Sequence, residues 1–495
     1  MRTLDPERPW GGALVVSGER IAAVLEDPAD APAGARRVDL AGACVVPGLV
    51  DAHVHFPSWA LARRELRLFG CGSLAEALER VRQAAGSVPR GAWLRGRGWR
   101  DELWGEKPTR QALDAVAPGA RIALRAHDGH SLWVSSAALA AAGGDLGVPG
   151  GVVETDDAGE PTGVLREESA WRFFDAHAAA GRAETLDAMR AALPAAAAAG
   201  VTGVHDKDGG RGAPELFAAL RAAGELTVRV WQSLPAERVA DGDVVPELAD
   251  PVLRIGYVKA FMDGTLGSRT ARLLDGSGVE ITSSARLAEL IRQAERAGFA
   301  LAVHAIGDQA NRDALDAFAA AATPGARHRI EHAQCIAPED VARFAALGIA
   351  ASVQYSHATS DRDLVERIWA DRVEHAYPFR SLWAAGVRLA GGSDAPVEEL
   401  DPLAGLRAAV LRTDSERAAW RPEQAIPAAA ALESFTVTPA WLSFDEHRRG
   451  RLRAGFDADL VVLDRDPLAD PPASVADARI VATMMGGDWI HSSGW

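Results

Sequence analysis

Short apolar runs of strand character recur along most of the chain. Between most of them lie stretches rich in Ala, Leu, Glu and Arg with apolar residues at helical spacing, for example residues 286–297, 309–322 and 338–346. Strands that alternate with helices of this length are typical of repeated βα units around a parallel sheet. The eight runs predict an α/β fold with a closed (β/α)8 barrel of the TIM type, and they span residues 43–54, 200–205, 227–232, 255–262, 299–304, 329–334, 349–354 and 387–392.

The two ends of the chain depart from this alternation and have the pattern of short strands joined by turns. At the C-terminal end, Gly455 and Asp457 are turn signals. Because both ends flank the barrel, we expect them to pair into one small β-sandwich. The expected strands are residues 12–17, 20–25 and 37–40 at the start, and residues 451–462 and 480–490 at the finish.

A long segment after the first barrel strand is the second departure. Residues 57–198 are too many for a single βα loop. The segment contains strand-like runs of its own at residues 93–98 and 122–126, so we expect an inserted α+β subdomain. The predicted division of the chain is therefore sandwich, barrel with insertion, and sandwich, with boundaries at residues 1–46, 47–445 and 446–495.

Composition narrows the class of protein without identifying it. The 495 residues are 48% hydrophobic and 24% charged, as in an ordinary soluble globular protein, and the net charge is −15. That charge argues against a nucleic-acid or anionic-membrane partner. Three scattered cysteines predict neither a disulfide framework nor a thiolate zinc site, and the chain shows no signal peptide or membrane span. We therefore expect a cytoplasmic protein.

Two histidines, His53 and His55, end the first predicted barrel strand. Residues i and i+2 of a strand point to the same face, so both imidazoles can converge on one ion. Imidazole is a common zinc ligand, and two rings supply half of a tetrahedral shell. Taken alone, the pair is also compatible with ordinary structural or solvent-facing histidines.

Residues at the ends of the later strands favour the metal-binding interpretation of this pair. Lys259, His304, His332 and Asp394 each stand at or just after the end of a predicted strand. In a (β/α)8 barrel these ends open onto one face, where the active site lies. Four histidines, one lysine and one carboxylate would then share a single cavity, and the sequence predicts a metal site there.

The chain resembles the amidohydrolase superfamily, in particular its large-insert amidohydrolase-3 branch, which includes N-substituted formamide deformylases. The resemblance covers nearly the whole length. It is carried in the barrel by VVPGLVDAHVHF (45–56), GYVKAFMDGTLGSRTA (256–271), VHAIGDQAN (303–311), RIEHAQ (329–334) and GGSDAPVEELDPL (391–403), and in the insert by GRGWRDELW (96–104), HDGHSLWVSSAAL (127–139) and GEPTGVLRE (159–167).

The resemblance implies a role for each strand-end residue. His53 and His55, with Asp394, would hold the more buried zinc ion, and His304 and His332 would hold a second metal ion. One or two zinc ions per chain are therefore expected.

Lys259 stands where binuclear relatives carry a carbamylated lysine that bridges both ions. Carbamylation needs a neutral amine, which burial near cations favours by lowering the lysine pKa. An unmodified lysine that closes a mononuclear site, or that pairs with Asp263, remains the alternative.

The expected reaction is hydrolysis of a C–N bond in a small amide, N-formyl or cyclic amide substrate by zinc-activated hydroxide. Asp394 would act as general base and then as general acid. His127, His130 and Tyr355 are candidates for substrate contacts, with a plain structural role as the alternative for both histidines. Ester hydrolysis or isomerisation on the same scaffold, or a metal-containing regulatory or binding protein without turnover, remain open. A homodimer is open as well.

Overall fold

A closed barrel of eight parallel strands forms the centre of the molecule. The computed structural model describes residues 1–89, 91–143, 146–240, 250–469, 472–475 and 477–493. The barrel strands follow one another in sequence order, and Val54 bridges Ala395, which closes the sheet. The strands are β4 (Leu49–Val54), β11 (Val201–Asp206), β12 (Arg229–Pro235), β13 (Leu253–Phe261), β14 (Ala300–Ala305), β15 (Arg329–His332), β16 (Ala350–Val353) and β17 (Leu389–Gly391).

The predicted (β/α)8 barrel is therefore confirmed, with one difference at its first strand. The expected run 43–54 divides at Gly48 into β3 (Cys44–Pro47), which joins another sheet, and β4. A side chain at Gly48 would meet the Thr202 hydroxyl at 2.3 Å, so only glycine lets the chain pass this point.

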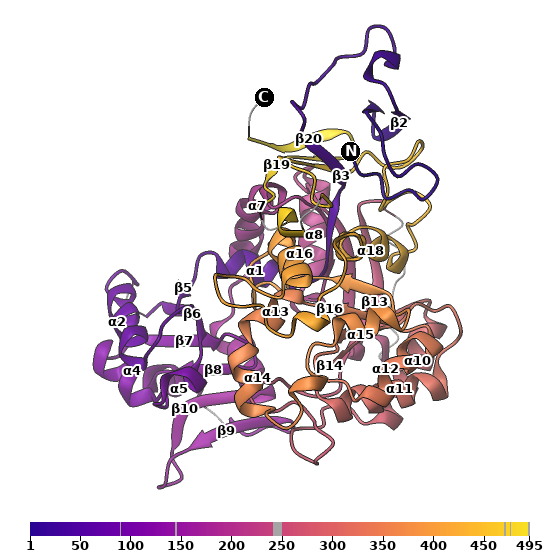
Figure 1. The fold of residues 1–495 in the computed structure, drawn as a ribbon. Helices are drawn as coiled ribbons and strands as arrows, with labels where there is room; N and C mark the ends of the chain where they lie inside the picture. Colours follow the sequence, from indigo (N-terminus) through magenta and orange to yellow (C-terminus); the bar gives the residue numbers. More distant parts are fainter. Residues whose placement is uncertain (90, 144–145, 241–249, 470–471, 476, 494–495) are drawn as a thin grey trace.

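Helices cover the outside of the barrel between the strands (Figure 1). The three helices expected at residues 286–297, 309–322 and 338–346 are present as α10, α11 and α12. The outer helices are α1 (Phe56–Ala62), α7 (Arg182–Ala198), α8 (Ala213–Ala222), α9 (Ala236–Ala240), α10 (Ser284–Arg296), α11 (Asp308–Ala321), α12 (Pro338–Leu347), α13 (Tyr355–Ser360), α14 (Arg362–Ile368), α15 (Phe379–Ala384), α16 (Pro402–Leu411), α17 (Ala428–Ser434) and α18 (Val437–Leu442).

The long segment after β4 forms a separate lobe, which lies at the lower left in Figure 1. Its sheet has six strands in the order β5-β6-β7-β8-β10-β9, and its helices enclose apolar clusters of their own. The two ends of the expected insert 57–198 pack against the barrel and not within the lobe, because α1 and α7 share a buried cluster with β11. The elements of the lobe are β5 (Leu66–Arg67), α2 (Leu74–Ala85), β6 (Trp93–Trp99), α3 (Asp101–Trp104), α4 (Arg110–Val116), β7 (Arg121–Ala126), β8 (Ser131–Val134), α5 (Ser136–Ala142), β9 (Gly151–Thr155), β10 (Pro161–Glu167) and α6 (Glu168–Phe173).

Both ends of the chain meet above the barrel in a small sandwich, as expected (Figure 1). A two-stranded sheet of β1 (Ala13–Ser17) and β2 (Arg20–Leu25) and a four-stranded sheet of β20-β19-β18-β3 enclose one apolar cluster. The C-terminal strands are β18 (Leu460–Leu463), β19 (Ile480–Met485) and β20 (Asp488–Ser492).

Two strand predictions for the sandwich are wrong. Residues 37–40 form no strand; Leu40 alone among them packs against the apolar cluster, so they lack the continuous buried face that would hold them in a sheet. Of the run 451–462, only the last residues form a strand, as the start of β18, and Asp457 makes a single isolated bridge to Arg20 of β2. Before them Asp457 accepts hydrogen bonds from Arg448 and Arg449, which holds this stretch in a loop. The domain boundaries stay a prediction.

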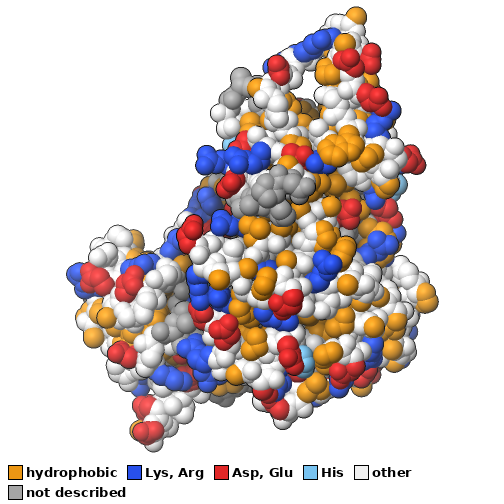
Figure 2. Space-filling model, in the orientation of Figure 1, with side chains coloured by type: hydrophobic (Ala, Val, Ile, Leu, Met, Phe, Trp, Pro, Cys, Tyr) orange, Lys and Arg blue, Asp and Glu red, His pale blue; other side chains and the backbone are white. Residues whose placement is uncertain are grey.

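Charged side chains of both signs are intermingled on the face shown in Figure 2. No helix among the described residues combines the length and the apolar character that a bilayer crossing requires.

Candidate metal centre

A cavity of about 820 Å³ lies at the C-terminal ends of the barrel strands. The barrel forms one wall and the inserted lobe forms the other. All six residues expected at the metal site line it: His53, His55, Lys259, His304, His332 and Asp394.

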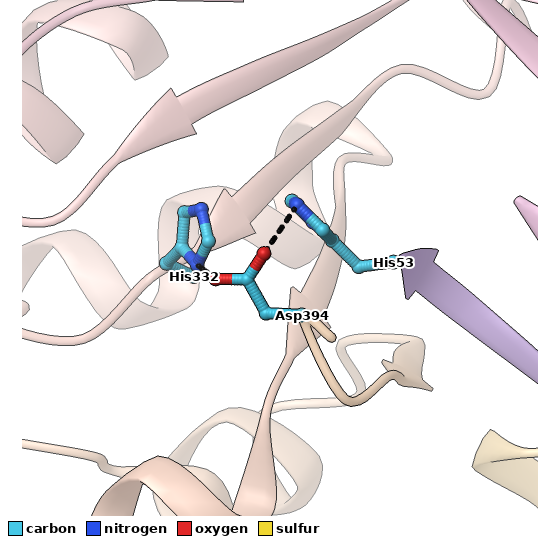
Figure 3. A group of neighbouring side chains, drawn as sticks. All are labelled: His53, His332 and Asp394. Atoms are coloured by element: carbon cyan, nitrogen blue, oxygen red, sulfur yellow. Dashed lines mark ion pairs between the residues drawn. The ribbon is translucent and has the colours of Figure 1, made fainter. Parts of the chain in front are cut away.

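Three of these residues form the closest group. Figure 3 shows the Asp394 carboxylate between the imidazoles of His53 and His332. His53 Nε2 lies 3.3 Å from Asp394 Oδ1, and His332 Nδ1 lies 3.9 Å from Asp394 Oδ2. One possible ligand atom of each residue lies within 4.8 Å of the others, so the group is compact enough for one ion.

The other three residues surround this group. His55 Nε2 lies 3.4 Å from Asp394 Oδ1, on the same carboxylate oxygen that faces His53. The ring of His304 lies 4.6 Å from that of His332, centre to centre. The Lys259 ammonium lies over the ring of Phe261, 4.6 Å from its centre.

The backbone is unusual at two of the three closest residues. His332 has a φ of 74° and Asp394 a φ of 57°, in the left-handed region that non-glycine residues seldom adopt. Such conformations cost free energy and tend to occur at functional sites. At the end of β15 this turn releases His332 from strict strand alternation, so Glu331 and His332 both reach the centre.

Two of the four imidazoles donate an outward hydrogen bond to a carboxylate. His53 Nδ1 lies 2.6 Å from Glu331 Oε2, and His55 Nδ1 lies 2.8 Å from Asp208 Oδ1. The bond fixes a proton on Nδ1, so that Nε2 is the ring nitrogen through which a metal ion would be bound. His53 Nε2 is buried without a hydrogen-bond partner in the described structure, so it is a polar atom that needs an occupant.

The other two imidazoles are held in the same manner by neutral acceptors. His304 Nε2 donates to the Gly264 carbonyl oxygen at 3.1 Å, and His332 Nδ1 donates to Gln354 Oε1 at 2.8 Å. Outward hydrogen bonds of this kind accompany nearly all histidines that bind metals in proteins. The residues present therefore fit a metal centre.

Burial sets the protonation of these rings. It lowers the pKa of His53, against the opposing effects of Glu331 and Asp394. Burial and neighbouring positive charges hold the pKa values of His304 and His332 well below the usual range, so both rings are neutral, the form that binds metal.

The pKa values of His55 and Asp394 indicate which charge the site favours. Burial lowers the pKa of His55, but Asp208 and Asp394 outweigh it and raise the pKa to about 9. The pKa of Asp394 is well below its usual range, because His53 and His55 outweigh the effect of burial. A cation beside this carboxylate is thus electrostatically favoured.

Two buried lysines line the same cavity. Burial lowers the pKa of Lys259 to about 8, against the attraction of Glu331 and Asp394. Burial and Arg329 lower the pKa of Lys207 to about 7, although its Nζ lies 3.4 Å from Glu331 Oε1. Both amines are therefore neutral more often than an exposed lysine.

Sequence reasoning missed the residues that hold the rings, namely Glu331, Asp208 and Gln354, and also Lys207. A signal was present for two of them, since Asp208 and Lys207 belong to the charged run that ends β11. Glu331 directly precedes His332, and strand alternation assigns it to the opposite face. Only the left-handed turn at His332 brings both side chains to the centre.

Of the three residues predicted to contact the substrate, the two histidines line the cavity and Tyr355 does not. His127 and His130 line the cavity from the lobe. His127 Nε2 lies 3.5 Å from Glu398, and His130 Nδ1 lies 2.7 Å from Glu167 Oε2.

The expectation for Tyr355 was wrong. Its side chain is fully buried in the main apolar cluster and does not line the cavity. The ring packs edge-on against Phe379 at 4.9 Å and also contacts Phe435. Tyr355 begins α13, and the first turn of this helix directs the ring into the core.

Comparison with known proteins agrees with this geometry. Residues 36–491 match the model of the amidohydrolase family. The chain is 32% identical to YtcJ of Bacillus subtilis (strain 168), over 92% of this chain and 90% of that protein. It is 29% identical to the N-substituted formamide deformylase of Arthrobacter pascens, over 98% of this chain and 96% of that enzyme.

A solved structure has the same fold. The crystal structure of an uncharacterized metal-dependent hydrolase from Pyrococcus furiosus superposes with a TM-score of 0.72 and 28% identity, covering 92% of this chain and 95% of that one. The resemblance to the amidohydrolase-3 branch is thereby confirmed. The chain belongs to the amidohydrolase family.

Proposed function

We propose that this protein hydrolyses a C–N bond in a small amide, N-formyl or cyclic amide substrate, as a cytoplasmic enzyme with one or two zinc ions in the barrel cavity. One observation carries the proposal: each of four imidazoles is held through one ring nitrogen by a fixed acceptor, so that the other ring nitrogen, once unprotonated, can bind a metal ion. Imidazole and carboxylate donors of this kind suit zinc. The proposed ligands are His53, His55, His304, His332, Asp394 and Lys259.

The role of Lys259 in this proposal is a carbamylated bridge. A neutral amine adds to CO2 through a new N–C bond and releases one proton to solvent, and the resulting carbamate anion would supply oxygen ligands to the metal site. The buried side chain, whose pKa is lowered to about 8, supports this reading. An unmodified Lys259 beside a single ion is the alternative.

A bound zinc ion polarises a carbonyl and lowers the pKa of a coordinated water. The protein supplies the proton transfers. Asp394 is kept ionised by His53 and His55, so it can take a proton from the attacking water. The oxygen of that water bonds to the carbonyl carbon, the C–N bond breaks, and Asp394 passes the proton to the leaving nitrogen.

Replacement of Asp394 by Asn tests the assignment. We expect turnover to fall by about 10²–10⁴-fold, because a positioned general base contributes on that scale. Asp340→Asn is the control: this buried carboxylate of α12 pairs with Arg312 on α11 and with Arg343 on α12, and it does not line the cavity. Zinc content and thermal unfolding measured on both variants separate loss of chemistry from loss of metal or fold.

Near-normal turnover in Asp394→Asn would refute the proposed role. A screen of N-acyl amines, N-formyl amines and esters with and without chelator tests the reaction class. Turnover of esters alone would favour the esterase alternative, and zinc binding without chelator-sensitive turnover would favour a regulatory or binding protein.

A further inference from the structure

Arg97 is a buried cation in the cavity wall that the proposed chemistry does not use. It lies near the end of β6 in the inserted lobe, is 3% exposed and lines the cavity together with His53 and Asp394. Its Nε and Nη1 atoms are buried without a hydrogen-bond partner. Within the described part of the chain, the guanidinium makes no hydrogen bond or ion pair.

The other arginines that line the cavity differ from Arg97 in this respect. Each has a carboxylate oxygen between 2.5 and 3.0 Å from a guanidinium nitrogen. They are Arg100, Arg125, Arg166, Arg172 and Arg286. A shortage of carboxylates does not explain the difference, because the chain has 68 acidic and 53 basic residues.

The local backbone is built to hold Arg97 in this position. The pairing of β6 with β7 shifts register between Arg97 and Trp99, a bulge of the kind that redirects a side chain. Between them Gly98 has a φ of 94°, and a side chain there would meet the Phe69 ring at 2.5 Å. Arg97 itself lies over that ring, 5.6 Å from its centre. Glycine thus allows a close fit between the bulge and Phe69.

Arg97 is charged at neutral pH. Burial and the charge of Arg125 lower the pKa of Arg97 to about 9, against the attraction of Glu65, Asp394 and Glu399. A buried charge without a partner is costly for a fold, and its guanidinium matches the geometry of a carboxylate. The free energy of the folded chain therefore favours an anion at this point.

We propose that Arg97 binds a carboxylate of the substrate, so that the preferred substrates are amides with a free carboxylate, such as N-acyl or N-formyl amino acids. This inference rests on the proposed function, because the reacting bond must lie at the barrel wall of the same cavity. The lobe would then hold the carboxylate while Asp394 serves the amide.

The test compares N-formyl and N-acetyl amino acids with their C-terminal carboxamides. We expect the zinc-loaded wild type to prefer the carboxylates by about 10–100-fold in kcat/KM, on the scale of a charge-assisted hydrogen bond. Arg97→Met should remove this preference and change kcat/KM for the carboxamides by less than about threefold. Arg97→Lys should restore part of it. Arg286→Met, which removes a cavity-lining cation already paired with Glu289, should leave it unchanged.

In the activity assay, two results would overturn the proposal: a wild type without carboxylate preference, or an Arg97→Met variant that loses both substrate types equally. Calorimetric titration of N-formyl amino acids into Asp394→Asn, with and without Arg97→Met, separates this proposal from the hydrolase proposal. Binding that depends on Arg97 supports the carboxylate site even if no amide is hydrolysed. Hydrolysis of carboxamides without a gain for carboxylates supports the hydrolase and refutes the carboxylate site, and absence of both binding and hydrolysis refutes both.

Discussion

The barrel and the inserted lobe face each other across one cavity, but they satisfy their polar groups in different ways. On the barrel side every candidate imidazole ligand donates one N–H to a fixed partner, which leaves the other ring nitrogen for a metal ion. On the lobe side, among the described arginines that line the cavity, each is paired with a carboxylate except Arg97. The barrel thus has the groups for chemistry, and the lobe has the groups that can select a substrate. Division of this kind between a rigid scaffold and its added segments is common in TIM barrels.

The largest effect is expected from disturbing an imidazole on the barrel side. Glu331→Gln removes the charge that orients His53 and that pairs with Arg329 and Lys207. Loss of such a partner commonly weakens metal binding by about 10–100-fold. We therefore expect zinc affinity to fall by that factor, measured by competition with a chelating dye, with the carboxylate preference of the remaining activity unchanged.

A matched control exists elsewhere in the fold. Glu295 lies 2.8 Å from the Nε2 atom of His328, a buried histidine outside the cavity. Glu295→Gln removes the same kind of carboxylate–histidine contact and should leave zinc affinity unchanged. Equal zinc affinity in Glu331→Gln and Glu295→Gln would mean that the outward hydrogen bonds of the barrel are merely structural.

A smaller effect is expected on the lobe side from Gly98→Ala. The positive φ costs an alanine about 1–3 kcal/mol, and the contact with Phe69 forces a shift beside Arg97. We expect a lower midpoint of unfolding and a several-fold loss of carboxylate preference, with zinc affinity retained. Chemical unfolding and the paired substrates of the Arg97 experiment measure both.

Gly159→Ala is the control for that change, because Gly159 also has a positive φ, 81°, but open space around it. Because of the positive φ, Gly159→Ala should lower the free energy of unfolding by a similar amount and leave the carboxylate preference intact. Equal loss of preference in both variants would show that the fit of Gly98 against Phe69 does not position Arg97.

The two walls also differ in how far the sequence predicts them. The barrel strands and the positions of His53, His304 and His332 follow from apolar runs whose ends must meet at one face of the barrel. The sequence of the lobe has no comparable repeat of strands whose ends must meet at one face. The position of Arg97 depends on a bulge and on pairing with distant strands, neither of which a local pattern records. Tyr355 shows the converse, since a strand-end position did not place its ring in the cavity.

The smallest effect is expected where the two regions join. Asp128, in the lobe, accepts hydrogen bonds from the hydroxyls of Thr265 and Ser268 in the barrel loop, at 2.7 and 2.8 Å. Burial raises the pKa of Asp128, but His130 and these hydroxyls outweigh it and the pKa is lowered. Ionised Asp128 therefore stabilises the fold at any pH above the unfolded carboxyl pKa of about 3.9, and this contribution is lost as pH falls through the lower pKa of the folded state.

Asp128→Asn should accordingly reduce the free energy of unfolding by about 1–2 kcal/mol at pH 7, on the scale of hydrogen bonds to a charged group. The difference from wild type should be the same at pH 5 and should shrink below about pH 4. Urea unfolding at several pH values measures it, with Asp156→Asn in the exposed turn between β9 and β10 as the control. A difference that stays constant down to pH 3 would mean that the charge of Asp128 does not join the lobe to the barrel, and the junction would then depend on neutral packing alone.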